Sequence, residues 1–194
     1  MSPPRARSPF GLPEVVLASA SPQRRRILED LGLSFRVQAA NVDELEAGDP
    51  VEVALANAVA KARGVDADPS ALVIGCDTVV ATEAGLWGKP RDEADAKRTL
   101  EHLSGRTHTV VSGLAVRRNG EIATRSVSTL VTFVDISLTS MTRYVATGEW
   151  RGRAGGYAIQ GSGAALIARI DGDLLNVIGL PVNALRQIAP ELHF

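Results

Sequence analysis

The chain has 194 residues, of which 45% are hydrophobic, 22% charged and 4% aromatic, with a formal net charge of −1. This length suits one domain, or two small lobes, with a substantial core. The charge balance predicts no binding to nucleic acid or membranes, and the few aromatic residues argue against a base-stacking platform. The single cysteine, Cys76, excludes an intrachain disulfide and a cysteine-rich zinc site, so we expect a cytoplasmic location. No apolar run reaches the roughly 20 residues of a membrane-spanning helix.

Residues 1–13 contain four prolines and no apolar segment, so we expect a disordered extension followed by a single domain at 14–194. Strands are predicted at 14–18, 34–38, 71–76, 110–116, 122–134 and 164–170. Helices are predicted at 22–31, 50–63, 92–105 and 139–147, and after Pro181. Asn119-Gly120 is a strong hairpin signal. The hairpin, together with helices that alternate with strands, predicts an α/β fold with a mixed sheet.

The helix predicted at 50–63 has an apolar stripe of Leu55, Ala58, Val59 and Ala62. Lys61 lies beside this stripe. A second lysine, Lys89, lies between a glycine and a proline in a tight turn that presents one ammonium group rigidly. Both lysines suit phosphate binding by a point charge, although each alone is more typical of an ordinary surface lysine.

The first predicted strand and helix meet in a turn that favours phosphate binding. The strand ends in the hydroxyls of Ser19 and Ser21, and the helix opens on Pro22 with three arginines in its first turns. Serine suits the N-cap and proline the first helical position. Because the helix dipole is positive there, arginines are favourable only if an anion covers the turn. The alternative is an ordinary capped helix with solvated arginines.

Asp77 follows a continuous apolar strand, where an unpaired carboxylate would be costly. Asp77 is therefore a candidate general base, although an aspartate capping a turn is the alternative. With Asp43 and Glu44 of an acidic loop it could hold a divalent cation such as Mg²⁺, which prefers oxygen ligands. A solvated acidic loop explains the same residues equally well.

The segment 148–161 contains five glycines and is too long for a simple connection. Its Gln160 carries a donor and an acceptor and could read the edge of a base, or could tie down the loop backbone. The three histidines form no metal or triad pattern, and neither a P-loop nor a dinucleotide-binding glycine motif is present.

Taken in order, the motifs resemble those of the Maf family of nucleoside triphosphate pyrophosphatases from about Val15 onward. The matching segments are LASASPQRR (17–25), VDE (42–44), AKA (60–62), GCDT (75–78), GKP (88–90), LSGRTH (103–108), AGGYAIQG (154–161) and NVIGLP (176–181).

The resemblance implies hydrolysis of a nucleoside triphosphate to the monophosphate and pyrophosphate, assisted by Mg²⁺ or Mn²⁺. It also implies an elongated mixed sheet flanked by helices, with two lobes and a central cleft as in inosine triphosphatases, and a possible homodimer. Asp77 would accept a proton, and Glu44 would help to hold the metal or position water. The residues assigned to catalysis are Glu44, Lys61, Asp77 and Lys89, with Glu44 and Asp77 as metal ligands. Those assigned to substrate binding are Ser19, Ser21, Gln23, Arg24, Thr78, Arg153 and Gln160.

Thr78 and Gln160 match positions associated with pyrimidine specificity, as in the branch that acts on dTTP and UTP. Two departures bear on the substrate: Gln23 replaces the usual arginine, and Gly152-Arg153 replaces the usual Asp-Lys. The alternatives are a pyrophosphatase for a modified nucleotide such as 7-methyl-GTP, and a nucleotide sensor that acts in cell-division arrest. A nucleotidyltransferase would need an acceptor site that the sequence does not reveal.

Overall fold

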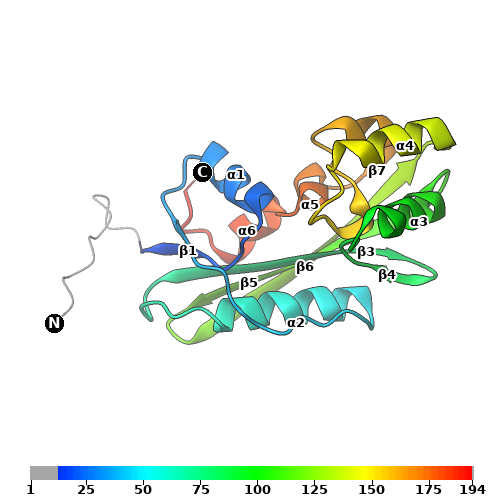
Figure 1. Ribbon diagram of the computed structural model, residues 1–194. Coiled ribbons are helices and arrows are strands. Elements are labelled where there is room, and N and C mark those ends of the chain that lie inside the picture. The colour runs from blue at the N-terminus through cyan, green and yellow to red at the C-terminus, as the bar shows by residue number, and fades with distance from the viewer. Residues whose placement is uncertain (1–12, 194) are drawn as a thin grey trace.

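The computed structural model describes residues 13–193 and contains one long mixed sheet with helices on both faces (Figure 1). The strand order is β2-β1-β3-β5-β6-β7, and β4 also pairs with β3. The strands are β1 (Val15–Leu17), β2 (Arg36–Val37), β3 (Leu72–Thr82), β4 (Gly85–Trp87), β5 (Thr107–Arg118), β6 (Glu121–Phe133) and β7 (Ile167–Asp171). β1 is parallel to β2 and β3, whereas the other neighbouring pairs are antiparallel. The predicted mixed α/β sheet is confirmed.

The helices are α1 (Pro22–Asp30), α2 (Pro50–Arg63), α3 (Glu93–Leu103), α4 (Leu138–Thr147), α5 (Leu174–Ile178) and α6 (Val182–Ile188), with short 3-10 helices η1 (Ala154–Gly156) and η2 (Ser162–Leu166). α2 covers one face of the sheet, and the other helices lie over the opposite face (Figure 1). On that face, one core cluster joins α1 and α6 to the sheet, and a second joins α3 and α4 to it. These clusters are the two predicted lobes.

Local signals explain most element boundaries. Ser21 caps α1 by accepting from the backbone N–H of Arg24, and Pro22 follows it, as predicted. Asn119 and Gly120 both have positive φ, as a tight hairpin between β5 and β6 requires. Gly148 ends α4 in the left-handed conformation.

The predicted apolar stripe of α2 is partly wrong. Its buried apolar residues are Val53, Ala54, Ala58 and Ala62, whereas Leu55 and Val59 are only half-buried. The reason is the short distance between helix and sheet. A Cβ at Gly75 would lie 2.2 Å from the carbonyl oxygen of Ala58, and one at Gly113 would lie 2.2 Å from that of Ala54. Only small residues fit at such a contact.

Two further differences lie in irregular regions. The strand predicted at 164–170 begins at Ile167, because 162–166 form η2. The sequence analysis missed β4 and α5, which are too short to show a clear period. Apart from Pro13, the predicted disordered extension lies outside the described residues.

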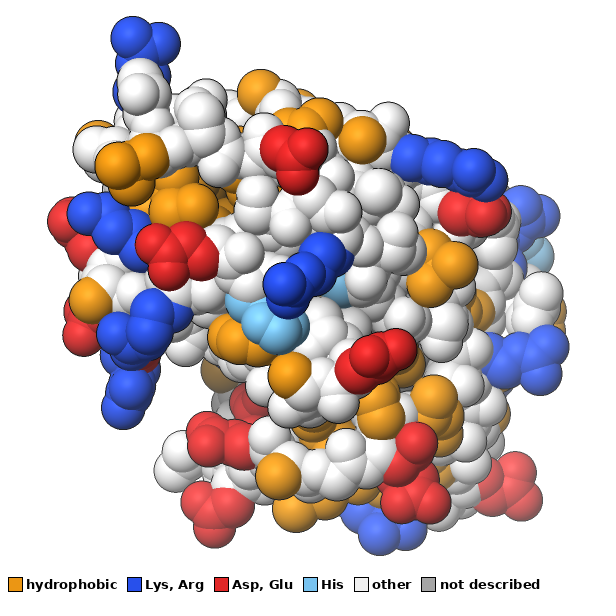
Figure 2. All heavy atoms as spheres, turned by 90° about the vertical axis from the view of Figure 1, so that its right-hand side faces the viewer, with side chains coloured by type: hydrophobic (Ala, Val, Ile, Leu, Met, Phe, Trp, Pro, Cys, Tyr) orange, Lys and Arg blue, Asp and Glu red, His pale blue; other side chains and the backbone are white. Residues whose placement is uncertain are grey.

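Figure 2 shows the end of the molecule that carries α3 and α4. Basic, acidic and apolar side chains are interspersed on this face, and no type forms a continuous patch. Among the described residues, no helix has the length and apolar character that a membrane span requires.

Candidate active site

The candidate site lies at an interruption in one edge of the sheet. On this edge β3 pairs with β1 through Leu72–Ile74 and with β4 through Val80–Thr82. Residues 75–79 therefore have no strand neighbour there. Successive side chains of a strand point to opposite faces, so Asp77 and Thr78 reach this opening from the two sides of the sheet.

A cavity of about 390 Å³ occupies the opening, within the usual range for ligand pockets. All the residues that the sequence analysis assigned to catalysis or substrate binding line it: Ser19, Ser21, Gln23, Arg24, Glu44, Lys61, Asp77, Thr78, Lys89, Arg153 and Gln160. They come from both lobes and from α2. Four of these side chains are basic and two are acidic, so the cavity favours an anionic ligand.

On the α2 side, Asp77 is 6% exposed and its carboxylate is fully paired. Lys61 Nζ lies 2.6 Å from Asp77 Oδ1 and 3.1 Å from Glu44 Oε2. Asn57 Nδ2 donates to Asp77 Oδ2 over 3.0 Å. Burial alone would raise the pKa of Asp77, but Lys61, the Asn57 amide and Arg24 outweigh it and hold this pKa below its ordinary value. Asp77 is therefore ionised at neutral pH.

On the opposite side of β3, Arg24 is 7% exposed and is held by three oxygen atoms. Its Nε donates to the carbonyl of Gly179 (2.8 Å), Nη1 to Ser19 Oγ (2.9 Å) and Nη2 to Thr78 Oγ1 (3.1 Å). Thr78 Oγ1 also lies 2.8 Å from Ser112 Oγ on β5. None of these partners carries a negative charge, so the buried guanidinium has no carboxylate partner among the described residues. An anionic ligand would stabilise this buried guanidinium.

The two arginines that follow fit the alternative interpretation of the turn. Arg25 and Arg26 are exposed and form i,i+4 ion pairs with Glu29 and Asp30. They do not line the cavity. Of the three arginines of α1, only Arg24 belongs to the candidate site.

Lys89 follows β4 and reaches the cavity from the second lobe. It is exposed and forms no ion pair with any residue that the structure describes. Two glycines fix its turn: Gly155 donates its N–H to the carbonyl of Gly88 (3.1 Å), and a Cβ at Gly156 would lie 2.9 Å from Pro90. Both have positive φ, so larger residues would strain this contact.

Hydrogen bonds hold the glycine-rich segment 148–163 in place. Tyr157 OH lies 2.9 Å from Nε2 of the buried His108, and Tyr144 OH accepts from the N–H of Ala158 (3.0 Å). The Glu149 carboxylate accepts from the N–H groups of Ser162 and Gly163, the first of which most strongly lowers its pKa. These contacts leave Gln160 exposed at the cavity, while Arg153 donates to the carbonyl of Glu149.

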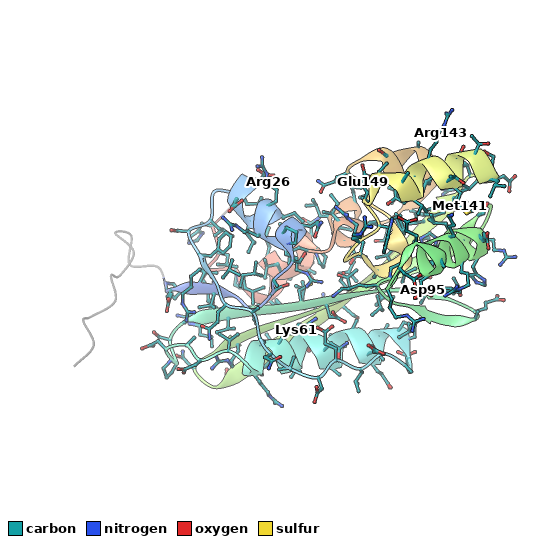
Figure 3. The ribbon with its side chains drawn as sticks, in the orientation of Figure 1. Arg26, Lys61, Asp95, Met141, Arg143 and Glu149 are labelled. Carbon is teal, nitrogen blue, oxygen red and sulfur yellow. The ribbon has the colours of Figure 1, made fainter. Side chains whose placement is uncertain are left out.

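Figure 3 locates two of these labelled side chains. Lys61 is on α2, and Glu149 lies on the other side of the long strands. Lys61 lines the cavity from the α2 face of the sheet, whereas Glu149 does not line it.

Asp43 is the one acidic candidate that the structure does not bring to the cavity, because it is exposed on the loop and does not line the opening. Within residues 13–193 no cluster of three or more His, Cys, Asp or Glu side chains could hold a metal. Glu44 and Asp77 alone supply carboxylate oxygens, and Lys61 lies between them.

The sequence analysis missed three supporting groups: Asn57, Ser112 and the carbonyl of Gly179. Asn57 could have been found, because it precedes Lys61 by four residues and so shares its helix face. Ser112 carries no sequence signal. Gly179 lies in the NVIGLP segment, but its contact with Arg24 could not be predicted, because the two residues come from distant segments.

Comparisons relate the chain to proteins of known sequence and structure. The Staphylococcus aureus Ham1 protein structure matches with a TM-score of 0.45 and 19% identity, over 63% of this chain and 72% of that chain. A dTTP/UTP pyrophosphatase of Moorella thermoacetica is 45% identical over 180 residues, 90% of this chain and 93% of that protein. One of Dictyoglomus thermophilum is 41% identical over 187 residues, 93% and 97% of the two chains. The sequence model of the Maf-like protein family matches residues 14–192, and the chain belongs to this family.

Proposed function

We propose that this protein hydrolyses nucleoside triphosphates, dTTP and UTP in particular, to the monophosphate and pyrophosphate. One observation carries the proposal: a single cavity unites a buried, ionised Asp77 with a buried guanidinium that lacks a carboxylate partner. The names of the relatives supply the nucleotides.

The triphosphate would bind where the two lobes face each other. Ser19 and Arg24 follow β1, and Lys89 follows β4, so they flank the opening in β3 from its two ends. A hydroxyl, a guanidinium and an ammonium group together offset the charge that develops on the leaving pyrophosphate. Because Lys89 has no ion pair within the described chain, binding need not break one.

Asp77 would take the proton of the attacking water. A new bond would form between the water oxygen and the α-phosphorus, the P–O bond from the α-phosphorus to the α–β bridging oxygen would break, and pyrophosphate would leave with the electron pair. Lys61 and Asn57 hold the two Asp77 oxygens, which fixes the direction in which the carboxylate accepts. Proton transfer to a positioned carboxylate contributes about 10²- to 10⁴-fold.

A divalent cation fits this site when the substrate supplies further ligands. Glu44 and Asp77 provide hard oxygen donors, and Mg²⁺ is commonly bound by one or two carboxylates together with substrate phosphates and water. Such an ion would neutralise phosphate charge. We expect EDTA to abolish turnover and added Mg²⁺ or Mn²⁺ to restore it. Full activity in EDTA would contradict the metal assignment.

The nucleobase of the substrate would be recognised at the rim of the cavity. Thr78 Oγ1 is already bonded to Arg24 and Ser112, so it shapes the pocket and does not donate freely to a ligand. Gln160 is exposed at the cavity and offers both a donor and an acceptor, which suits a pyrimidine edge. A cytoplasmic location and a homodimer remain predictions.

The test is a pyrophosphate-release screen with dTTP, UTP, CTP, 7-methyl-GTP and inosine triphosphate. We expect the highest kcat/KM with dTTP and UTP. A preference for 7-methyl-GTP would reassign the substrate, and rates near background with every nucleotide would favour a sensor instead.

A further inference from the structure

Asn57 is a buried amide on the inner face of α2 that the reaction scheme above uses only in passing. It is 3% exposed and makes three hydrogen bonds. Its Oδ1 accepts from the N–H of Leu45 (2.7 Å), and its Nδ2 donates to the carbonyl of Leu45 and to Asp77 Oδ2 (both 3.0 Å). The amide therefore connects the acidic loop to the central strand.

The orientation of this amide is fixed by its partners. Rotating it by 180° would place its NH₂ group against the N–H of Leu45 and its oxygen against the Asp77 carboxylate, and both contacts would be repulsive. Both Nδ2 hydrogens are used, so the side chain has no remaining donor. Such a fully satisfied buried polar group is rigid.

The hydrogen bonds from Asn57 to Leu45 affect the site because Leu45 is next to Glu44 in the chain. Leu45 is the residue after Glu44, so fastening its backbone places Glu44 at the cavity, where its Oε2 lies 3.1 Å from Lys61 Nζ. The same amide holds the Asp77 oxygen that Lys61 does not. Lys61 lies one helical turn beyond Asn57, so one face of α2 sets both carboxylates.

We infer that Asn57 is a positioning residue that holds Glu44 and Asp77 in their relative places for hydrolysis. The inference rests on the proposed function. It assigns Asn57 no contact with substrate, and Asn57 does not line the cavity. The residues proposed to grip the triphosphate come from other elements, so loss of Asn57 should reduce kcat more than it raises KM.

Two variants separate the roles of the amide. Asn57→Ala removes all three bonds. Asn57→Asp keeps the acceptor for the Leu45 N–H but loses both donors and places a carboxylate beside Asp77. Thr99→Val is the control, because it removes a buried hydroxyl that bonds only within α3.

We expect Asn57→Ala to lower kcat by about 10- to 100-fold with KM changed less than about threefold, as misplaced catalytic groups do. Hydrogen–deuterium exchange at the Leu45 amide should accelerate in Asn57→Ala and stay slow in Asn57→Asp, while kcat falls in both. Thr99→Val should change neither kcat nor this exchange rate.

A kcat within twofold of wild type in both Asn57 variants, or a KM that rises as much as kcat falls, would overturn the inference. If the wild-type protein turns over no triphosphate, the proposed function fails. The exchange measurement still tests whether Asn57 holds the loop, and unchanged exchange in Asn57→Ala would refute that too.

Discussion

A carboxylate that is 6% exposed needs a partner, and Asp77 has Lys61 at 2.6 Å. The pair leaves Asp77 ionised and oriented, as a proton acceptor must be. Removing its charge should affect the chemical step far more than binding, because the proposed triphosphate contacts come from Ser19, Arg24 and Lys89.

We expect Asp77→Asn to lower kcat by at least about 10²-fold, because the amide cannot accept the proton. Affinity for a non-hydrolysable triphosphate analogue, measured by calorimetry, should stay within about threefold of wild type. Asp43→Asn is the matched control, since Asp43 is an exposed carboxylate that does not line the cavity. Near-normal turnover by Asp77→Asn would show that the base lies elsewhere.

Lys89 differs from Lys61 because it is exposed and unpaired within the described chain. We expect Lys89→Ala to lower kcat/KM by about 10²-fold, through lost stabilisation of the phosphate charge, with an unchanged melting temperature. Lys97→Ala on α3, which does not line the cavity, should leave both quantities unchanged. A lower melting temperature with normal kcat/KM would mean that Lys89 serves only the fold.

At the scale of elements, the site depends on how closely α2 approaches the sheet. Gly75 and Gly113 leave room for the backbone of the helix, and Ala54, Ala58 and Ala62 face them. This contact brings Asn57 and Lys61 of α2 within hydrogen-bond distance of Asp77 on β3.

We expect Gly75→Ala to lower the free energy of unfolding by about 1–3 kcal/mol, because the new Cβ would meet the Ala58 carbonyl and force α2 outward. Activity should fall with it, since Lys61 moves with the helix. Urea denaturation and pyrophosphate release measure the two effects. Gly88→Ala is the control for stability, because a Cβ there meets nothing within 4 Å.

The same contact shows where sequence reasoning succeeds and where it stops. Caps and breakers such as Ser21, Pro50 and Gly148 place helix ends, because their effects are local. The buried face of α2 was misjudged, because the choice of small over large residues depends on glycines in strands that are distant in sequence. Asp77 could be singled out by its apolar surroundings, but its bond to Asn57 could not, because no local pattern encodes it.

At the scale of the whole molecule, His108 couples stability to pH. It is 2% exposed, and burial lowers its pKa to about 4. The unfolded chain binds this proton near pH 6.5, so between about pH 6.5 and 4 the unfolded state holds more protons than the folded state. The folded state therefore loses stability as the pH falls through this window, and the effect vanishes above it.

We expect the low pKa of His108 to reduce the free energy of unfolding by about 2 kcal/mol when the pH falls from 7 to 5. In His108→Gln, which keeps a polar group for Tyr157, the pH dependence should be weaker by that amount. Urea denaturation of both proteins at the two pH values measures the difference. Parallel pH dependence in wild type and variant would rule out His108 as its source.

The interrupted edge of β3 has a consequence for solubility as well as for access. A free sheet edge invites pairing with strands of other molecules, which leads to aggregation. Here the stretch 75–79, which has no strand neighbour on this side of β3 and is buried or half-buried, is bounded by β1 at one end and by β4 at the other. A compact ligand can enter such a short vacancy, whereas an incoming strand finds no continuous row of backbone groups to extend along. The gap along β3 therefore admits a small ligand but does not allow a strand of another molecule to pair there.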